Sequence, residues 1–171
     1  MSEYLNDLAA DISIAMTGQG FWKDWDRVHL ALIEITRHIN SSKQQQQAAV
    51  PEAETELEML QAFRRSLISE KLMLMSTEIS EAMEALRKNR RVSAADMERL
   101  RFGELHEPDP SCEFNKTPFE KYVKDTLEDE IADLFIRALD FCGKLNIDID
   151  WHIEQKSIYN ATRPRRHGKE C

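Results

Sequence analysis

Glycine and proline are scarce in this chain, with five of each among its 171 residues. Both residues interrupt helices, so their scarcity leaves long stretches in which a helix can run without a break. The chain also lacks any run of about 18 apolar residues, which argues against a membrane-spanning helix. We therefore expect an all-α helical bundle of four to five main helices, formed by residues 1–171 as a single domain.

Cysteine is also rare. The three cysteines, Cys112, Cys142 and Cys171, are odd in number and widely spaced, which is typical of free thiols in a reducing compartment rather than of a disulfide framework. Residues 1–4 carry neither the basic nor the apolar region of a signal peptide. These features together predict a cytoplasmic protein.

Positive charge is outweighed by negative charge, with 23 basic against 31 acidic residues and a formal net charge of −8. The phosphate backbone of nucleic acids attracts basic surfaces, so this balance argues against general nucleic-acid binding. Any polyphosphate ligand must therefore meet positive charge at one particular place on the protein.

Apolar residues recur at helical spacing over five segments of the chain. The second segment begins near Asp24, and the last can be capped by Asp148 or Asp150 and is closed by Pro164. The fourth has an irregular start. The predicted helices cover approximately residues 1–16, 24–39, 56–87, 118–145 and 148–162.

Two segments interrupt this pattern. Residues 41–56 are polar and rich in glutamine, which predicts a flexible linker. Residues 88–119 form an insertion that contains a short helix opened by Ser93, with Asp96 three residues later. The sequence leaves three roles open for this insertion: a lid, a packing element or an oligomer contact.

A pair of acidic residues three positions apart occurs twice in the chain, and it is the pattern that indicates a functional site. Glu78 and Glu81 lie in the third predicted helix, and Glu130 and Asp133 lie in the fourth. Positions three apart are separated by about 60° around a helix, so each pair can direct two carboxylates at one point.

The two pairs hold equivalent positions on their helices. The first acid of each pair lies at roughly −100°, and the second at roughly −160°, from the centre of the apolar face, which is Ile79 in one helix and Ile131 in the other. An acid inside an apolar arc is costly to bury unless it is paired or bound to metal. If the helices pack antiparallel, all four carboxylates converge. For either pair taken alone, the alternative is an ordinary solvated face.

Four converging carboxylates predict a site for a hard divalent cation. Neither pair has a histidine at its second position, whereas di-iron sites in helical bundles use Glu-x-x-His. Oxygen-only ligands favour Mg²⁺, with Mn²⁺ as a substitute, over iron or zinc. We therefore predict that Glu78, Glu81, Glu130 and Asp133 are the metal ligands.

The last predicted helix carries a basic face. Lys156, Asn160 and Arg163 follow each other at i, i+4 and i+7, so they share one side of the helix. Phosphate oxygens suit this set, which combines a point charge, an amide donor and a two-pronged guanidinium. Beyond Pro164, a basic disordered tail is an equally good interpretation. A cation held by carboxylates beside such a face predicts binding of a nucleotide polyphosphate.

Taken in order, Glu78-x-x-Glu81, Glu130-x-x-Asp133 and Lys156-x-x-x-Asn160-x-x-Arg163 resemble the motifs of the all-α nucleoside triphosphate pyrophosphatases, the MazG-like proteins. The resemblance covers residues 21–169. It implies a helical homodimer or homotetramer that uses Mg²⁺ to hydrolyse a nucleoside triphosphate, often a surplus or non-standard deoxynucleotide, to monophosphate and diphosphate. It also implies that the acids hold the metal and are the catalytic residues, and that the last three residues named contact phosphates.

The second predicted helix carries aromatic residues that suit recognition of a nucleobase. Trp22, Trp25 and His29 are the candidates to stack on or bond the nucleobase, and we assign Trp25 to the substrate site. The alternative is a core position, where large aromatic residues at helical spacing lie more often. The linker and the insertion depart from the compact pattern of the family. A nucleotide-binding protein without catalysis and a structural helical bundle therefore stay open as alternatives to the enzyme.

Overall fold

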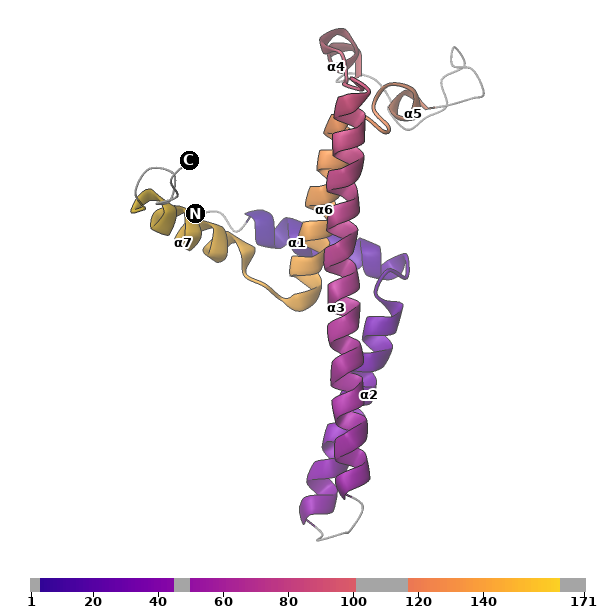
Figure 1. Cartoon of the computed structure of the whole chain (residues 1–171), viewed down its shortest axis with the longest axis vertical. Helices are drawn as coiled ribbons and strands as arrows, with labels where there is room; N and C mark the ends of the chain where they lie inside the picture. The colour runs from indigo at the N-terminus through magenta and orange to yellow at the C-terminus, as the bar shows by residue number, and fades with distance from the viewer. Residues whose placement is uncertain (1–3, 45–49, 101–116, 164–171) are drawn as a thin grey trace. The chain divides into compact units, whose positions relative to one another are not determined.

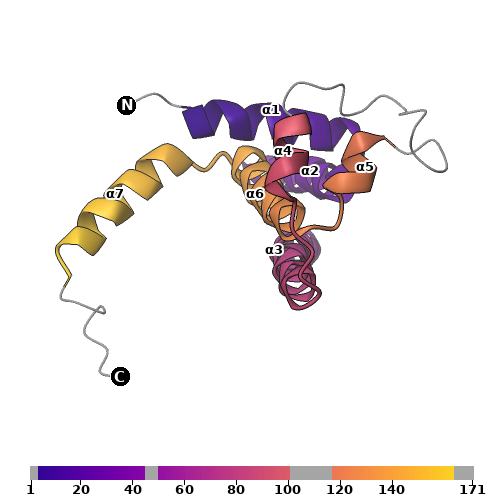
Figure 2. The same cartoon turned by 90° about the horizontal axis from the view of Figure 1, so that it is seen from above.

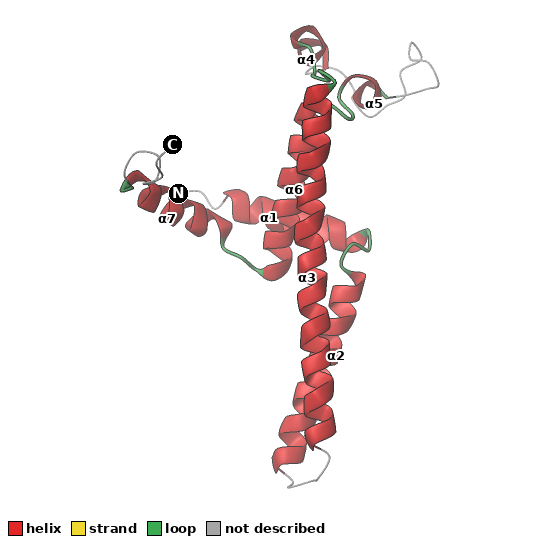
Figure 3. Ribbon diagram, in the orientation of Figure 1, coloured by secondary structure: helices red, strands yellow, loops and turns green. Residues whose placement is uncertain are grey.

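The computed structural model describes residues 4–44, 50–100 and 117–163. Within these ranges the chain forms helices joined by turns and no strand (Figure 3), which confirms the predicted all-α fold. No helix in the described ranges has both the length and the apolar character needed to cross a membrane. The helices are α1 (Tyr4–Gly18), α2 (Lys23–Gln44), α3 (Val50–Arg87), α4 (Ala94–Leu100), α5 (Pro118–Tyr122), α6 (Leu127–Leu145) and α7 (Ile149–Ala161).

Several helix ends lie where the capping residues predict them. The backbone N–H of Asp96 donates to Ser93 Oγ at 3.0 Å, which opens α4. Asp148 caps α7 by accepting from the backbone N–H of Trp151. The irregular start predicted for the fourth helix is a break between α5 and α6, where Asp125 adopts a left-handed φ of 60°.

Helices α2 and α3 extend further than the sequence predicts. Of the segment 41–56, residues 41–44 continue α2 and residues 50–56 begin α3, while residues 45–49 lie outside the described ranges. Pro51 lies in the first turn of α3, where a proline is tolerated because its missing N–H needs no partner. Residues 101–116 of the insertion also lie outside the described ranges.

The chain divides into two compact units, although its length and composition predict one domain. The first unit comprises Met1–Ser69 and Ala138–Cys171, and the second comprises Glu70–Arg137. Helices α3 and α6 each contribute one part to each unit. The two units bury different kinds of residue.

The first unit has an apolar core around two tryptophans. The rings of Trp22 and Trp25 meet edge to face with their centroids 5.9 Å apart. They pack against the N-terminal part of α3, beside which α2 lies (Figure 1). Trp22 Nε1 donates to both carboxylate oxygens of the buried Asp140, at 2.8 Å and 2.9 Å. The acid inside this core is therefore paired with a donor.

A second apolar cluster joins α1 to α6 in the same unit. It includes Ala9 of α1 and Leu139 of α6. The helices approach so closely that a Cβ added to Gly143 would lie 2.3 Å from the carbonyl oxygen of Ala9, so a glycine is required there. Helix α7 then begins beside α1 (Figure 2), where Asn6 Nδ2 donates to Asp148 Oδ1 at 2.8 Å.

The second unit buries acids and small residues on α3 and α6. Glu78, Glu130 and Thr126 are buried together with Ala82 and Ala85. The apolar faces centred on Ile79 and Ile131 are exposed in the single chain, because the sides that carry the acids face the neighbouring helix. The exposed apolar residues of these two helix segments are Leu72, Met73, Ile79, Met83, Leu86, Ile131, Phe135 and Ile136.

Candidate metal centre

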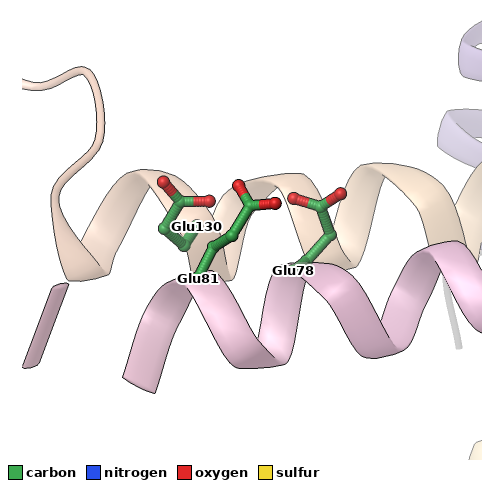
Figure 4. A group of neighbouring side chains, drawn as sticks. All are labelled: Glu78, Glu81 and Glu130. Carbon is green, nitrogen blue, oxygen red and sulfur yellow. The ribbon is translucent and has the colours of Figure 1, made fainter. Parts of the chain in front are cut away.

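Three of the four predicted acids meet in the second unit. Glu78 and Glu81 of α3 and Glu130 of α6 each offer a carboxylate oxygen, and these oxygens lie within 4.8 Å of one another (Figure 4). Glu78 is 3% exposed and Glu130 is 7% exposed, whereas Glu81 is open to solvent. The three residues, called the acidic group below, are thus enclosed on one side and accessible through Glu81.

Asp133 lies outside the acidic group. It is half-buried, one turn along α6 from Glu130. Burial raises its pKa, and so do the negative charges of Asp129, Glu78 and Glu81, while the charge of Arg137 lowers it. Asp133 therefore lies within electrostatic reach of the acidic group, and its role as a metal ligand stays a prediction.

The acidic group is short of positive charge. Burial, followed by the charges of Glu81, Asp129, Asp133 and Glu78, raises the pKa of Glu130 to about 7. No basic residue contributes to that shift. A bound divalent cation would act in the opposite direction, because an adjacent positive charge favours the ionised carboxylate. Oxygen donors with more negative charge than their neighbours balance suit a hard cation such as Mg²⁺.

Arg137 is the residue of this site that the sequence analysis misses. Its Nε donates to Glu78 Oε1, and its side chain is 28% exposed. Among the described residues, no other basic side chain pairs with the acidic group or with Asp133. Arg137 follows Asp133 at i+4 on the same helix, a spacing that brings side chains together and that could have indicated it.

A cavity of about 180 Å³ opens beside Glu81 and Glu130. Its lining also includes Lys88 and Arg90, which flank the end of α3, where Asn89 adopts a left-handed φ of 54°. The volume lies below the roughly 300 Å³ at which pockets for whole small-molecule ligands begin. The cavity is therefore large enough for only part of a nucleotide.

The predicted phosphate-binding residues belong to the other unit. Lys156 and Asn160 lie on α7, and Arg163 follows its end. Lys156 Nζ lies 5.2 Å, and Arg163 Cζ 5.7 Å, from the ring centroid of Tyr159. The two cations thus lie around one aromatic ring. Their binding of the phosphates of a nucleotide at the acidic group stays a prediction.

Trp25 lies in the core of the first unit, not on an open surface. It is 6% exposed, and the guanidinium of Arg64 covers its ring, with Cζ 4.5 Å from the ring centroid. A nucleobase could stack on this ring only after Arg64 had left it. The structure therefore supports the core position that the sequence leaves as an alternative, because the indole buries more apolar surface there than a solvent-exposed site allows.

Comparisons of the chain with models of protein families, with curated proteins and with solved structures found no match. Oxygen-only donors from two helices, partly enclosed and without a matching counter-charge, fit a divalent cation that keeps some ligand positions for water or phosphate.

Proposed function

We propose that the protein is a Mg²⁺-dependent nucleoside triphosphate pyrophosphohydrolase, which converts a nucleoside or deoxynucleoside triphosphate and water to the monophosphate and diphosphate. The convergence of Glu78, Glu81 and Glu130 carries this proposal. Mg²⁺ in nucleotide enzymes is commonly bound through a few carboxylates and the phosphates of the substrate, and this group supplies such carboxylates. Mn²⁺ is expected to substitute for it.

The acids and the cation have separate tasks in this proposal. When bound, the cation supplies Lewis-acid polarisation of phosphate oxygens and a template for the substrate. Glu78 and Glu130 hold it from two different helices, and Glu81 completes the protein ligands on the solvent side. Asp133 lies next to these ligands without joining them, which suits a carboxylate that orients the attacking water.

The remaining charge of the triphosphate calls for basic residues. We assign this task to Lys156, Asn160 and Arg163, whose donors are of the types that bind phosphate oxygens. The gathering of Lys156 and Arg163 around Tyr159 supports a shared role for them. Replacing Lys156 with alanine is expected to raise KM for the nucleotide more than it lowers kcat.

We also propose that the protein forms a homodimer or homotetramer through the exposed apolar face of the second unit. Met83 is 57% exposed and Phe135 is 63% exposed, and they belong to a larger set on the same two helix segments. Apolar surface gathered in this way is typical of an interface. We expect the double variant Met83→Glu and Phe135→Glu to be monomeric in analytical ultracentrifugation.

The matched control for this variant is Ile14→Glu, which changes an exposed apolar residue of α1 in the first unit. It is expected to leave the oligomeric state of the wild-type protein unchanged. A wild-type protein that sediments as a monomer at micromolar concentration would overturn the proposed oligomer.

The activity is tested with a panel of natural and modified nucleoside triphosphates in the presence of Mg²⁺. We expect release of diphosphate from at least one nucleotide and no release after chelation of the metal. Binding of a nucleotide without diphosphate release would contradict the enzyme and support the non-catalytic alternative. If no nucleotide and no metal binds, the structural alternative holds instead.

A further inference from the structure

Arg137 uses only part of its hydrogen-bonding capacity within the protein. Its Nε donates to Glu78, and no described residue accepts a hydrogen bond from its Nη1 or Nη2. A guanidinium has five N–H donors, so four remain on the two terminal nitrogens. The side chain is partly open to solvent, which leaves those donors accessible to a ligand.

The contact through Nε has a geometric consequence. It engages one edge of the planar guanidinium and restrains its orientation, while the edge formed by Nη1 and Nη2 remains unused. That unused edge can make two parallel hydrogen bonds to a phosphate. Glu78, which is almost fully buried, thereby acts as a fixed anchor for the guanidinium.

The charge of the site also favours a phosphate donor at this position. Glu78, Glu81, Glu130 and Asp133, when ionised, outweigh Arg137 and one divalent cation together by one negative charge. A polyphosphate entering such a site is repelled unless donors in reach compensate its own charge. Among the described residues, Arg137 is the one basic side chain in contact with the acidic group.

We propose that Arg137 is a phosphate-binding residue of the metal centre. Glu78 holds its Nε, and its Nη1 and Nη2 donate to oxygens of a phosphoryl group in the metal-bound polyphosphate. This inference rests on the proposed function and deepens it, because it gives the second unit a phosphate donor of its own. A purely structural Arg137 would only neutralise the buried Glu78, a task that any positive charge performs.

Arg137→Lys separates these two roles. Lysine keeps a positive charge beside Glu78, but its single ammonium cannot reproduce the two-pronged contact. Isothermal titration calorimetry is carried out first with Mn²⁺ alone, and then with methylenediphosphonate, a non-hydrolysable diphosphate, in saturating Mn²⁺. We expect Mn²⁺ affinity within about threefold of the wild type and diphosphonate affinity reduced about tenfold or more, as for the loss of one charged hydrogen bond.

Arg91→Lys provides the matched control. Arg91 also donates its Nε to a glutamate, with 2.6 Å to Glu128 Oε1, but that glutamate lies outside the acidic group. Both affinities of this variant are expected to equal those of the wild type. An equal loss of diphosphonate affinity in the two variants would overturn the role of Arg137.

The remaining outcomes distinguish this inference from the proposed function. Unchanged diphosphonate affinity in Arg137→Lys, or a matching loss of Mn²⁺ affinity, overturns the phosphate-binding role and leaves the metal site standing. Failure of the wild-type protein to bind Mn²⁺ overturns the proposed function itself. If Arg137→Lys does not fold by circular dichroism, nitrogen-15 NMR of the wild-type guanidinium decides: diphosphonate must shift the Arg137 Nη resonances, and no shift overturns the proposal.

Discussion

Both units of the protein bury carboxylates, but Asp140 of the first unit and Glu130 of the second differ in their hydrogen bonding. In the first unit Asp140 accepts two hydrogen bonds from the indole of Trp22. In the second unit the side chain of Glu130 accepts no hydrogen bond from a described residue, and burial and neighbouring acids raise its pKa to about 7. Buried polar groups are usually satisfied, so this exception supports the proposed metal centre.

The apolar residues show the same contrast. The first unit encloses its two core tryptophans, while the second leaves Met83 and Phe135 exposed and buries glutamates with small residues. The first unit therefore suits the role of a scaffold. The second unit suits the proposed site and the proposed interface, because local rules of folding are commonly broken where a protein functions.

The largest effect is expected from a change in the acidic group. Glu81→Gln removes one carboxylate of the proposed metal centre at its solvent-facing position, so it leaves the interior intact. Loss of even an indirect partner of a metal commonly costs about 10- to 100-fold in affinity or activity, so turnover should fall by more than about 100-fold. Diphosphate release under saturating Mg²⁺ measures it.

Glu84→Gln is the control, because Glu84 lines the same cavity and lies one turn further on α3, but it pairs with Lys88 at 3.1 Å and is not part of the acidic group. Its turnover should stay within about twofold of the wild type, since exposed ion pairs contribute little. If Glu81→Gln kept wild-type turnover, the acidic group would not be needed for activity, and the functional difference between the two units would not hold.

The next effect concerns the satisfied acid of the first unit. Trp22→Phe removes the indole N–H that donates to the buried Asp140 and should lower the free energy of unfolding by about 1–3 kcal/mol, the cost of a lost hydrogen bond to a buried charged group. Urea denaturation measures this loss. Mn²⁺ affinity should be unchanged, because the acidic group lies in the second unit. Trp151→Phe, at an exposed indole of α7, should leave both quantities unaltered.

The smallest effect is the pH dependence of the metal-free protein. The pKa of Glu130 is raised from 4.5 to about 7, so between these pH values the folded protein binds more protons than the unfolded chain. The stabilising contribution of the protonated group is complete below pH 4.5 and is lost as pH rises through 7. In EDTA, the free energy of unfolding should therefore decrease across this window.

Glu130→Gln cannot ionise, so urea denaturation of this variant should show a weaker decrease over the same window and higher stability than the wild type at pH 8. Mg²⁺ should remove the decrease in the wild-type protein, because the cation favours the ionised carboxylate. Parallel pH profiles of the wild type and the variant in EDTA would contradict this account of Glu130.

The sequence predicts those features of the fold that depend on local chemistry. Apolar spacing locates the long helices, and Ser93 and Asp148 indicate two helix starts because their side chains satisfy free backbone N–H groups. The equivalent offsets of the two acid pairs also predict that carboxylates from α3 and α6 can meet. For Glu78, Glu81 and Glu130 the structure confirms this meeting.

The remaining features depend on which surfaces meet in three dimensions. Helical periodicity gives the angle between Glu78 and Ile79, but not which of them faces the neighbouring helix, and the structure buries the acid. The i+4 spacing places Arg137 beside Asp133, but its contact with Glu78 depends on how α3 and α6 pack. Trp25 had two interpretations, and the packing of Arg64 on its ring favours the core.

The central claim is that the acidic group binds a divalent cation. Isothermal titration calorimetry of EDTA-treated protein with Mn²⁺ tests this claim most directly. The titration is carried out on the wild type and on the variants Glu81→Gln and Glu84→Gln. The account predicts saturable binding to the wild type and to Glu84→Gln, and at least about tenfold weaker binding to Glu81→Gln. No saturable binding to the wild type, or equal binding to all three proteins, would contradict it.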